Sequence, residues 1–160
     1  MIRLALAFAL AASSGSAAAS LPRQGVLVPG KSLAGVGLGA TPSAVRARWG
    51  TRFRTCDRCA ERTWYYTYSR ATGVGVSFRG GRVSALFTLG SPQGWRTREG
   101  LRLGDAIDRV DELYGGLPWK ACIGYSALTM RSGRVVTAIY ASGESVYGFA
   151  LARLGEPICQ

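Results

Sequence analysis

The four cysteines are the residues of this chain whose type and spacing point most directly to chemistry. Cys56 and Cys59 form a Cys-x-x-Cys motif beside Arg54, Arg58 and Arg62, and neighbouring guanidinium groups lower the pKa of a thiol. A thiol–disulfide redox centre is therefore one hypothesis. Redox proteins usually place this motif between a strand and a long helix, whereas here it follows a predicted short helix and precedes a predicted strand. The context favours a structural disulfide.

Four cysteines allow three pairings. We predict Cys56–Cys59, which closes a tight loop, together with Cys122–Cys159, which tethers the C-terminal tail. A three-stranded meander after Cys122 would put Cys122 and Cys159 at opposite ends unless the tail folds back, so a Cys56–Cys122 bond stays an alternative. One Cys-x-x-Cys with two scattered cysteines is not a typical zinc site, and neither a metal nor a cofactor is predicted.

Arginines are the second group that points to chemistry, through anion binding. Arg79 and Arg82 flank a predicted hairpin tip at Gly80-Gly81, and Arg131 and Arg134 flank a second tip. In both hairpins the expected register sets two like charges opposite each other, which costs stability unless an anion lies between them. A bound phosphate or acidic partner is one interpretation. The alternative is solubilising charge on exposed hairpins.

An aromatic strand at 64–68 lies close to further arginines. Trp64, Tyr66 and Tyr68 share one face of this predicted strand, which is either core or a binding platform, and the alternation favours the core. Basic residues among aromatics also suit single-stranded nucleic acid, a ligand that an exported protein rarely meets. The candidate contacts for a partner or an anion are Arg52, Arg54, Arg58, Arg62, Tyr65, Arg79, Arg82, Arg131 and Arg134.

The chain contains no histidine. This excludes Ser-His-Asp and Cys-His nucleophilic sites, HExxH zinc sites and an imidazole general base. Carboxylates between 105 and 112 recur at i, i+3 spacing on the polar side of an amphipathic helix, where solvation and the helix dipole explain them. We therefore expect a protein that is not an enzyme.

Residues 1–19 have the pattern of a signal peptide. Arg3 precedes an unbroken apolar run, 4–12, and small residues at 17–19 form a cleavage site. The run is too short to span a bilayer. We expect a mature chain of residues 20–160, secreted or periplasmic and without a transmembrane segment, in which the even number of cysteines forms disulfides.

The whole chain has a formal net charge of +11, and most of this positive charge lies in its first half. Residues 20–90 hold eleven basic and two acidic side chains, whereas residues 91–160 hold eight and seven. Such a field attracts anionic partners. We expect an acidic protein or an anionic envelope component to contact residues 46–82.

A diverged repeat with an offset of 65 residues organises the chain. In each copy a short apolar segment ends in glycine, a capped helix of about ten residues follows, and antiparallel strands come next. The predicted N-caps are Thr41 and Asp105, and Gly50 and Gly115 suit left-handed positions at the helix ends. The matched residues are Gly35, Gly39, Val45 and Gly50 with Gly100, Gly104, Val110 and Gly115.

The predicted fold class is α+β. Two diverged repeats, at about 33–90 and 95–153, each place a short helix on about three antiparallel strands, and with a tail at 154–160 they form one compact domain. The two-residue turn at Gly80-Gly81 sets the register of the first hairpin. It pairs Phe78 with Val83, Val76 with Ala85 and Val74 with Phe87, all on one face.

This pattern resembles the tandem-repeat fold of β-lactamase-inhibitor proteins, since an apolar segment ending in Leu-Gly, a capped helix ending in aromatic-Gly and a hairpin set occur twice. It is also similar to single-unit small lipoproteins of outer-membrane assembly. The stretches 29–33, 63–66 after the Cys-x-x-Cys, and 94–97 ahead of 100–104 look like a group of uncharacterised secreted bacterial proteins. The resemblance to the β-lactamase-inhibitor fold covers most of residues 33–153 and implies inhibition of an extracellular enzyme.

The function predicted from these features is that of an exported, non-enzymatic binding protein, an inhibitor-like module for an acidic extracellular or envelope partner. Two alternatives remain: a structural or assembly factor of the cell envelope, and a thiol–disulfide protein that acts through Cys56 and Cys59.

Overall fold

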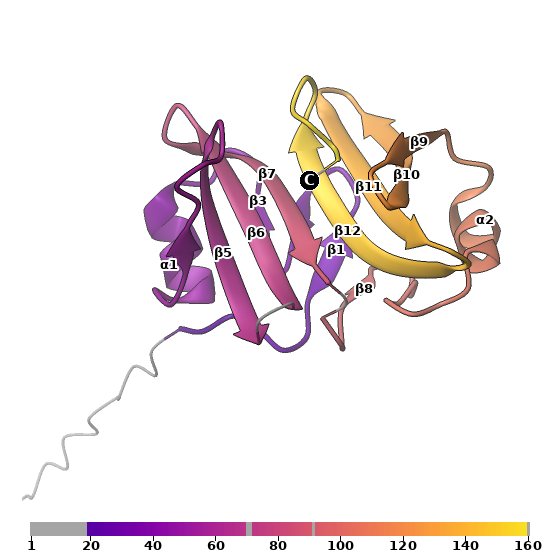
Figure 1. Ribbon diagram of the computed structural model, residues 1–160, viewed down its shortest axis with the longest axis horizontal. Coiled ribbons are helices and arrows are strands. Elements are labelled where there is room, and N and C mark those ends of the chain that lie inside the picture. Colours follow the sequence, from indigo (N-terminus) through magenta and orange to yellow (C-terminus); the bar gives the residue numbers. More distant parts are fainter. Residues whose placement is uncertain (1–18, 70–71, 91, 160) are drawn as a thin grey trace, which may run out of the picture.

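The computed structural model describes residues 19–69, 72–90 and 92–159. Residues 1–18, which hold nearly all of the predicted signal peptide, lie outside this part of the chain. The described chain folds into two β-sheets and two short helices (Figure 1). Neither helix is long and apolar enough to cross a membrane.

The larger sheet has eight strands and is antiparallel throughout. Two four-stranded meanders meet where β7 pairs with β12, with Leu86 opposite Leu151. In spatial order the strands are β4 (Arg54–Thr55), β5 (Arg62–Ser69), β6 (Thr72–Arg79), β7 (Arg82–Leu89), β12 (Ser145–Arg153), β11 (Val135–Ser142), β10 (Tyr125–Ser132) and β9 (Trp119–Cys122).

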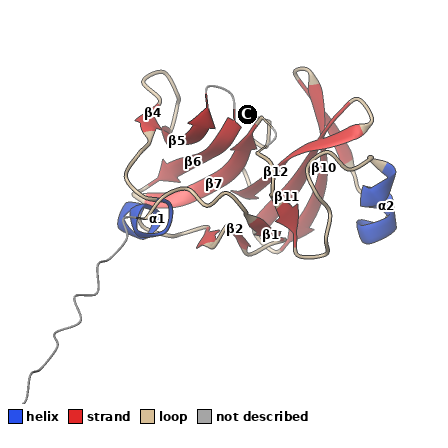
Figure 2. Ribbon diagram, turned by 90° about the horizontal axis from the view of Figure 1, so that it is seen from below, coloured by secondary structure: helices blue, strands red, loops and turns tan. Residues whose placement is uncertain are grey.

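The smaller sheet is made of short strands from two distant parts of the sequence. Its order is β3 (Val36–Gly37), β2 (Ser32–Leu33), β1 (Val26–Val28) and β8 (Arg96–Thr97), and β8 pairs with β1 in parallel. This sheet lies behind the larger one in Figure 1. The helices α1 (Pro42–Trp49) and α2 (Asp108–Tyr114) lie at opposite ends of the molecule (Figure 2).

The main core fills the space between the two sheets. Leu27 and Leu33 of the smaller sheet are fully buried with Trp64 of the larger one. Helix α1 joins this core through Trp49, whose indole N–H donates to the Ala34 carbonyl at 3.1 Å. A helix of eight residues is too short to be stable alone, so this packing is what holds α1 in place.

The opposite face of the larger sheet carries a second, smaller core of alanines, Phe87 and Tyr140. The C-terminal tail folds back over this face, and Ile158 is only 8% exposed there. The Tyr140 hydroxyl donates to the Ile158 carbonyl at 2.6 Å. Beside them Gly75 leaves room for the Phe87 ring, which lies 2.2 Å from where a Cβ would stand.

The predicted α+β fold class is wrong. The chain is mostly β, and one continuous sheet replaces the two helix-on-sheet units. The two helices, of eight and seven residues, cover only the ends of the larger sheet, so the rest of its inner face must be covered by something else. Four strands of two or three residues, at 26–28, 32–33, 36–37 and 96–97, do this, and they are too short for a periodicity to reveal.

Some local predictions are confirmed and others are not. The Thr41 side chain caps α1 by accepting from the Ala44 N–H at 3.2 Å, but Asp105 does not cap α2, because it accepts instead from the Arg102 N–H at 2.7 Å. Phe78 pairs with Val83 as predicted.

A bulge beside Ser77 and Phe78 then shifts the register of the first hairpin by one residue. The next pairs are Ser77 with Ala85 and Val76 with Leu86. Consequently Leu86 faces the main core, whereas Ala85 and Phe87 face the second one.

Candidate functional site

The cysteines form the two predicted disulfides. Cys56 bonds to Cys59 and Cys122 to Cys159, and no described cysteine is free. The second bond is compatible with the meander because the tail returns across the sheet to β9, which carries Cys122. The Cys56–Cys122 alternative is thus not adopted.

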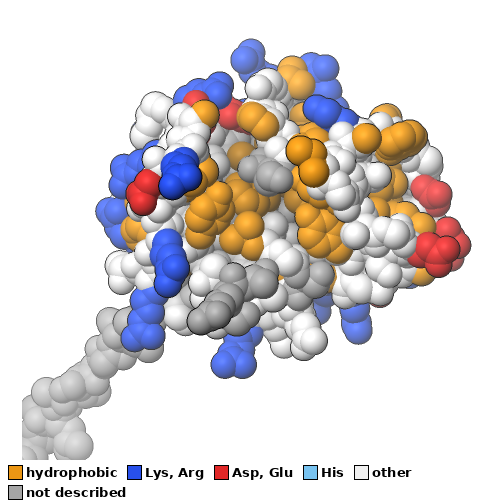
Figure 3. Space-filling view, in the orientation of Figure 1, with side chains coloured by type: hydrophobic (Ala, Val, Ile, Leu, Met, Phe, Trp, Pro, Cys, Tyr) orange, Lys and Arg blue, Asp and Glu red, His pale blue; other side chains and the backbone are white. Residues whose placement is uncertain are grey.

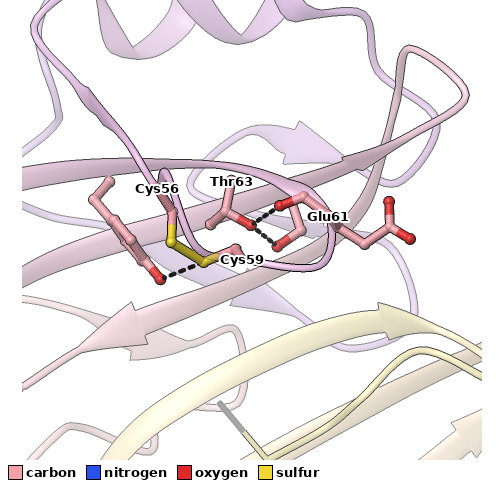
Figure 4. Close-up of a disulfide and its surroundings, with 6 residues drawn as sticks. Cys56, Cys59, Glu61 and Thr63 are labelled. Carbon is pink, nitrogen blue, oxygen red and sulfur yellow. Dashed lines mark hydrogen bonds between the residues drawn. A yellow bond between two sulfur atoms is a disulfide. The ribbon is translucent and has the colours of Figure 1, made fainter.

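The Cys56–Cys59 bond spans the hairpin loop between β4 and β5 (Figure 4). The same loop is closed by the Cys56 N–H, which donates to the Thr63 carbonyl at 2.9 Å, and by Thr63 Oγ1, which donates to the Glu61 carbonyl. A strand follows the motif instead of a helix, so no helix N-terminus is available to stabilise a thiolate. Among the described residues no cluster of three or more His, Cys, Asp or Glu side chains suits a metal ion.

Three of the predicted arginine contacts, Arg52, Arg54 and Arg58, are exposed along the segment from α1 to the disulfide loop. Arg62 is exposed as well, with its guanidinium 5.0 Å from the centre of the Trp64 ring, a cation–π distance. Tyr65 lies on the other face of β5, against Phe87 at 6.3 Å between ring centroids. We call Arg52, Arg54, Arg58 and Arg62 the basic surface.

The molecule is electrically asymmetric. In Figure 3 Lys and Arg side chains surround the half that contains α1 and the end of the larger sheet at the top, whereas acidic side chains gather over α2. Helix α2 carries exposed Asp108, Asp111 and Glu112. No member of the basic surface forms an ion pair with a carboxylate of the described residues.

The two predicted arginine pairs have different outcomes. Arg79 and Arg82 are directly opposite each other, as expected. Arg131 instead faces Val136, because Gly133 and Arg134 themselves form the two-residue turn. Arg131 therefore has no arginine opposite it, and its Nε donates to the Gly133 carbonyl at 3.0 Å.

Both hairpin tips nevertheless lie at the same end of the larger sheet, because β7 and β12 run antiparallel at its centre (Figure 1). There Arg79, Arg134 and Arg153 line a pocket of about 390 Å³. Its one carboxylate is Glu156, and the apolar part of its wall comes from Leu38, Val135 and Leu154. The tertiary structure thus joins one arginine from each predicted hairpin with a third that was not predicted.

The aromatic strand belongs largely to the core. Trp64 and Tyr66 are buried, whereas Tyr68, at the end of the strand, is 41% exposed. Burial raises the pKa of the Tyr66 hydroxyl to about 12, despite the lowering effect of Arg46, and this hydroxyl donates to the Gly50 carbonyl at 3.1 Å. The strand therefore offers one exposed aromatic ring and no platform.

The fold is similar to that of three bacterial proteins of known structure, one described as extracellular and one as secretory. An extracellular protein containing an SCP domain from Bacillus anthracis matches with a TM-score of 0.55 and 10% identity over 72% of this chain and 44% of that one. A DUF4309 family protein from Bacillus subtilis matches with a TM-score of 0.54 and 14% identity, over 71% of this chain and 78% of that one. A cysteine-rich secretory protein from Staphylococcus aureus matches with a TM-score of 0.51 and 12% identity, over 83% of this chain and 47% of that one.

At these identities the likeness concerns the fold alone. The chain spans less than half the length of the Bacillus anthracis and Staphylococcus aureus proteins. No protein-family model matches the chain, and no curated protein matches it in sequence.

Sequence reasoning missed Arg153 and Glu156 as members of the site. Arg153 ends the last strand, where it pairs with Val135, and nothing in the sequence indicates that this strand lies beside β7. Glu156 belongs to the tail and reaches Arg79 only because the tail turns back. A signal was present in the charge pattern, since Arg153 at the end of the last strand and Glu156 in the tail are the only charged residues of the stretch 145–160.

Proposed function

We propose that the protein is an exported, non-enzymatic binding protein whose basic surface contacts an acidic protein or an anionic component of the cell envelope. The observation that carries this proposal is the exposure of Arg52, Arg54, Arg58 and Arg62 without carboxylate partners among the described residues. Unpaired guanidinium groups on one surface attract anionic partners over a Debye length and then pair with their carboxylates or phosphates.

Three further observations support it. Two disulfides fit an oxidising compartment outside the cytoplasm, and the fold is that of extracellular proteins. The absence of histidine from the chain removes the commonest general base. Inhibition of an extracellular enzyme, as the resemblance to β-lactamase-inhibitor proteins implies, is the specific form of this function.

The test is a pulldown from the secreted and envelope fractions of the producing organism, at about 50 and about 500 mM salt. The triple variant R52Q/R54Q/R58Q is compared with R96Q/R98Q/R102Q, which removes three exposed arginines from the second half of the chain. We expect a partner that is retained at low salt by the wild type and the control variant, and lost at high salt and in the basic-surface variant. Equal loss in both variants, or retention at high salt, would refute the contact.

A further inference from the structure

The pocket at the end of the larger sheet has an unbalanced charge. Three guanidinium groups, from Arg79, Arg134 and Arg153, face one carboxylate, from Glu156. The Glu156 side chain is only 4% exposed, and it pairs with Arg79 at 3.1 Å. A buried carboxylate needs such a partner, so Arg79 is bound in place, and it also pairs with Glu61 at 3.0 Å.

Arg134 and Arg153 have no such partners. Within the described chain neither guanidinium pairs with a carboxylate, although both are held at one pocket. Their backbones are fixed: the Leu154 N–H donates to the Arg134 carbonyl at 2.8 Å, and the Glu156 N–H donates to the Arg153 carbonyl at 3.0 Å. The backbone is therefore held in place at both positions, and repulsion between two unpaired guanidinium groups that line one pocket favours an anion there.

We infer that this pocket binds a phosphate monoester. A phosphate monoester carries close to two negative charges at neutral pH, which matches the two guanidinium groups, of Arg134 and Arg153, that pair with no carboxylate of the described residues, and guanidinium groups bind phosphate oxygens in a bidentate manner. The pocket, at about 390 Å³, is larger than a phosphate group, and Leu38, Val135 and Leu154 provide apolar wall for the carbon part of the ester. This assignment goes beyond the proposed partner contact, because the pocket shares no residue with the basic surface.

Isothermal titration with phenyl phosphate, inorganic phosphate and benzoate tests the inference. We expect phenyl phosphate to bind more tightly than inorganic phosphate, because its ring contacts the apolar wall, and more tightly than benzoate, which carries the same ring but one charge. Equal affinity for benzoate would overturn the match to a dianion. Equal affinity for inorganic phosphate would overturn the inference that the pocket recognises the carbon part of an ester. No binding of phenyl phosphate at millimolar concentration would overturn the inference that the pocket is an anion site.

Two variants locate the site. R134Q/R153Q removes both free guanidinium groups and should weaken phenyl phosphate binding by about a hundredfold, roughly tenfold for each lost charge-assisted contact. The control R98Q/R102Q removes the same charge from another surface and should change binding less than threefold, so equal weakening in both would overturn the assignment.

The variant Glu156→Gln should change the affinity for phenyl phosphate in the opposite direction. It removes the negative charge of the lining with almost no change in shape and should strengthen binding roughly threefold. Damage to the fold cannot produce that increase. Unchanged or weaker binding in this variant would mean that the charge of the pocket does not determine affinity.

Discussion

The two disulfides should differ in their contribution to stability, because they close loops of very different length. The bonded cysteines are 37 residues apart in Cys122–Cys159 and three apart in Cys56–Cys59. A cross-link stabilises mainly by restricting the unfolded chain, and the restriction grows with the logarithm of loop length. This relation gives about 4 kcal/mol for the long loop and about 2 kcal/mol for the short one at 25 °C.

The assay is urea unfolding of C122S/C159S and C56S/C59S, followed by the fluorescence of the four tryptophans. We expect C122S/C159S to lose about 2 kcal/mol more free energy of unfolding than C56S/C59S. Its denaturant slope should also increase more, because its unfolded state gains more exposed surface. Equal losses, or a larger loss in C56S/C59S, would refute the argument from loop length.

Three further predictions concern single residues. Gly75→Ala should cost about 1–3 kcal/mol of stability, because the new Cβ would overlap the Phe87 ring, whereas Gly116→Ala, with open space around it, should be nearly neutral in the same urea assay. Thr41→Ala should lower stability by about 1 kcal/mol through loss of the α1 cap, and Thr41→Ser should restore most of it. Because the pKa of Tyr66 is raised from 10.0 to about 12, its contribution to stability is complete below pH 10 and falls as pH rises toward 12. Tyr66→Phe should make the melting temperature less sensitive to pH over this range, and an unchanged slope would contradict the assignment.

Local features of the fold follow from the sequence wherever neighbouring residues decide them. Thr41-Pro42 predicted the start of α1, since a hydroxyl cap and a proline at the first helical position need no tertiary partner. Gly80-Gly81 predicted the hairpin turn, where both glycines have positive φ. The preferred disulfide pairing is also confirmed, but the sequence left Cys56–Cys122 open, and the return of the tail to β9 is what selects Cys122–Cys159.

The candidate site was only half predictable. Arg79 and Arg134 were identified from hairpin tips, but as members of two separate pairs. The single extra residue of the bulge beside Phe78 cannot be read from an alternating pattern, and it reverses the faces of Ala85 and Phe87.

The sequence by itself determined the α1 cap, the Gly80-Gly81 turn, the Cys56–Cys59 bond and the uneven charge, because each depends on residue type and short spacing. Only the tertiary structure decided that β7 pairs with β12, that short strands from both halves form a second sheet, and that the tail returns over the outer face. These choices depend on which apolar surfaces can be covered simultaneously, a property of the whole chain. They are also what bring Arg79, Arg134 and Arg153 together at one pocket.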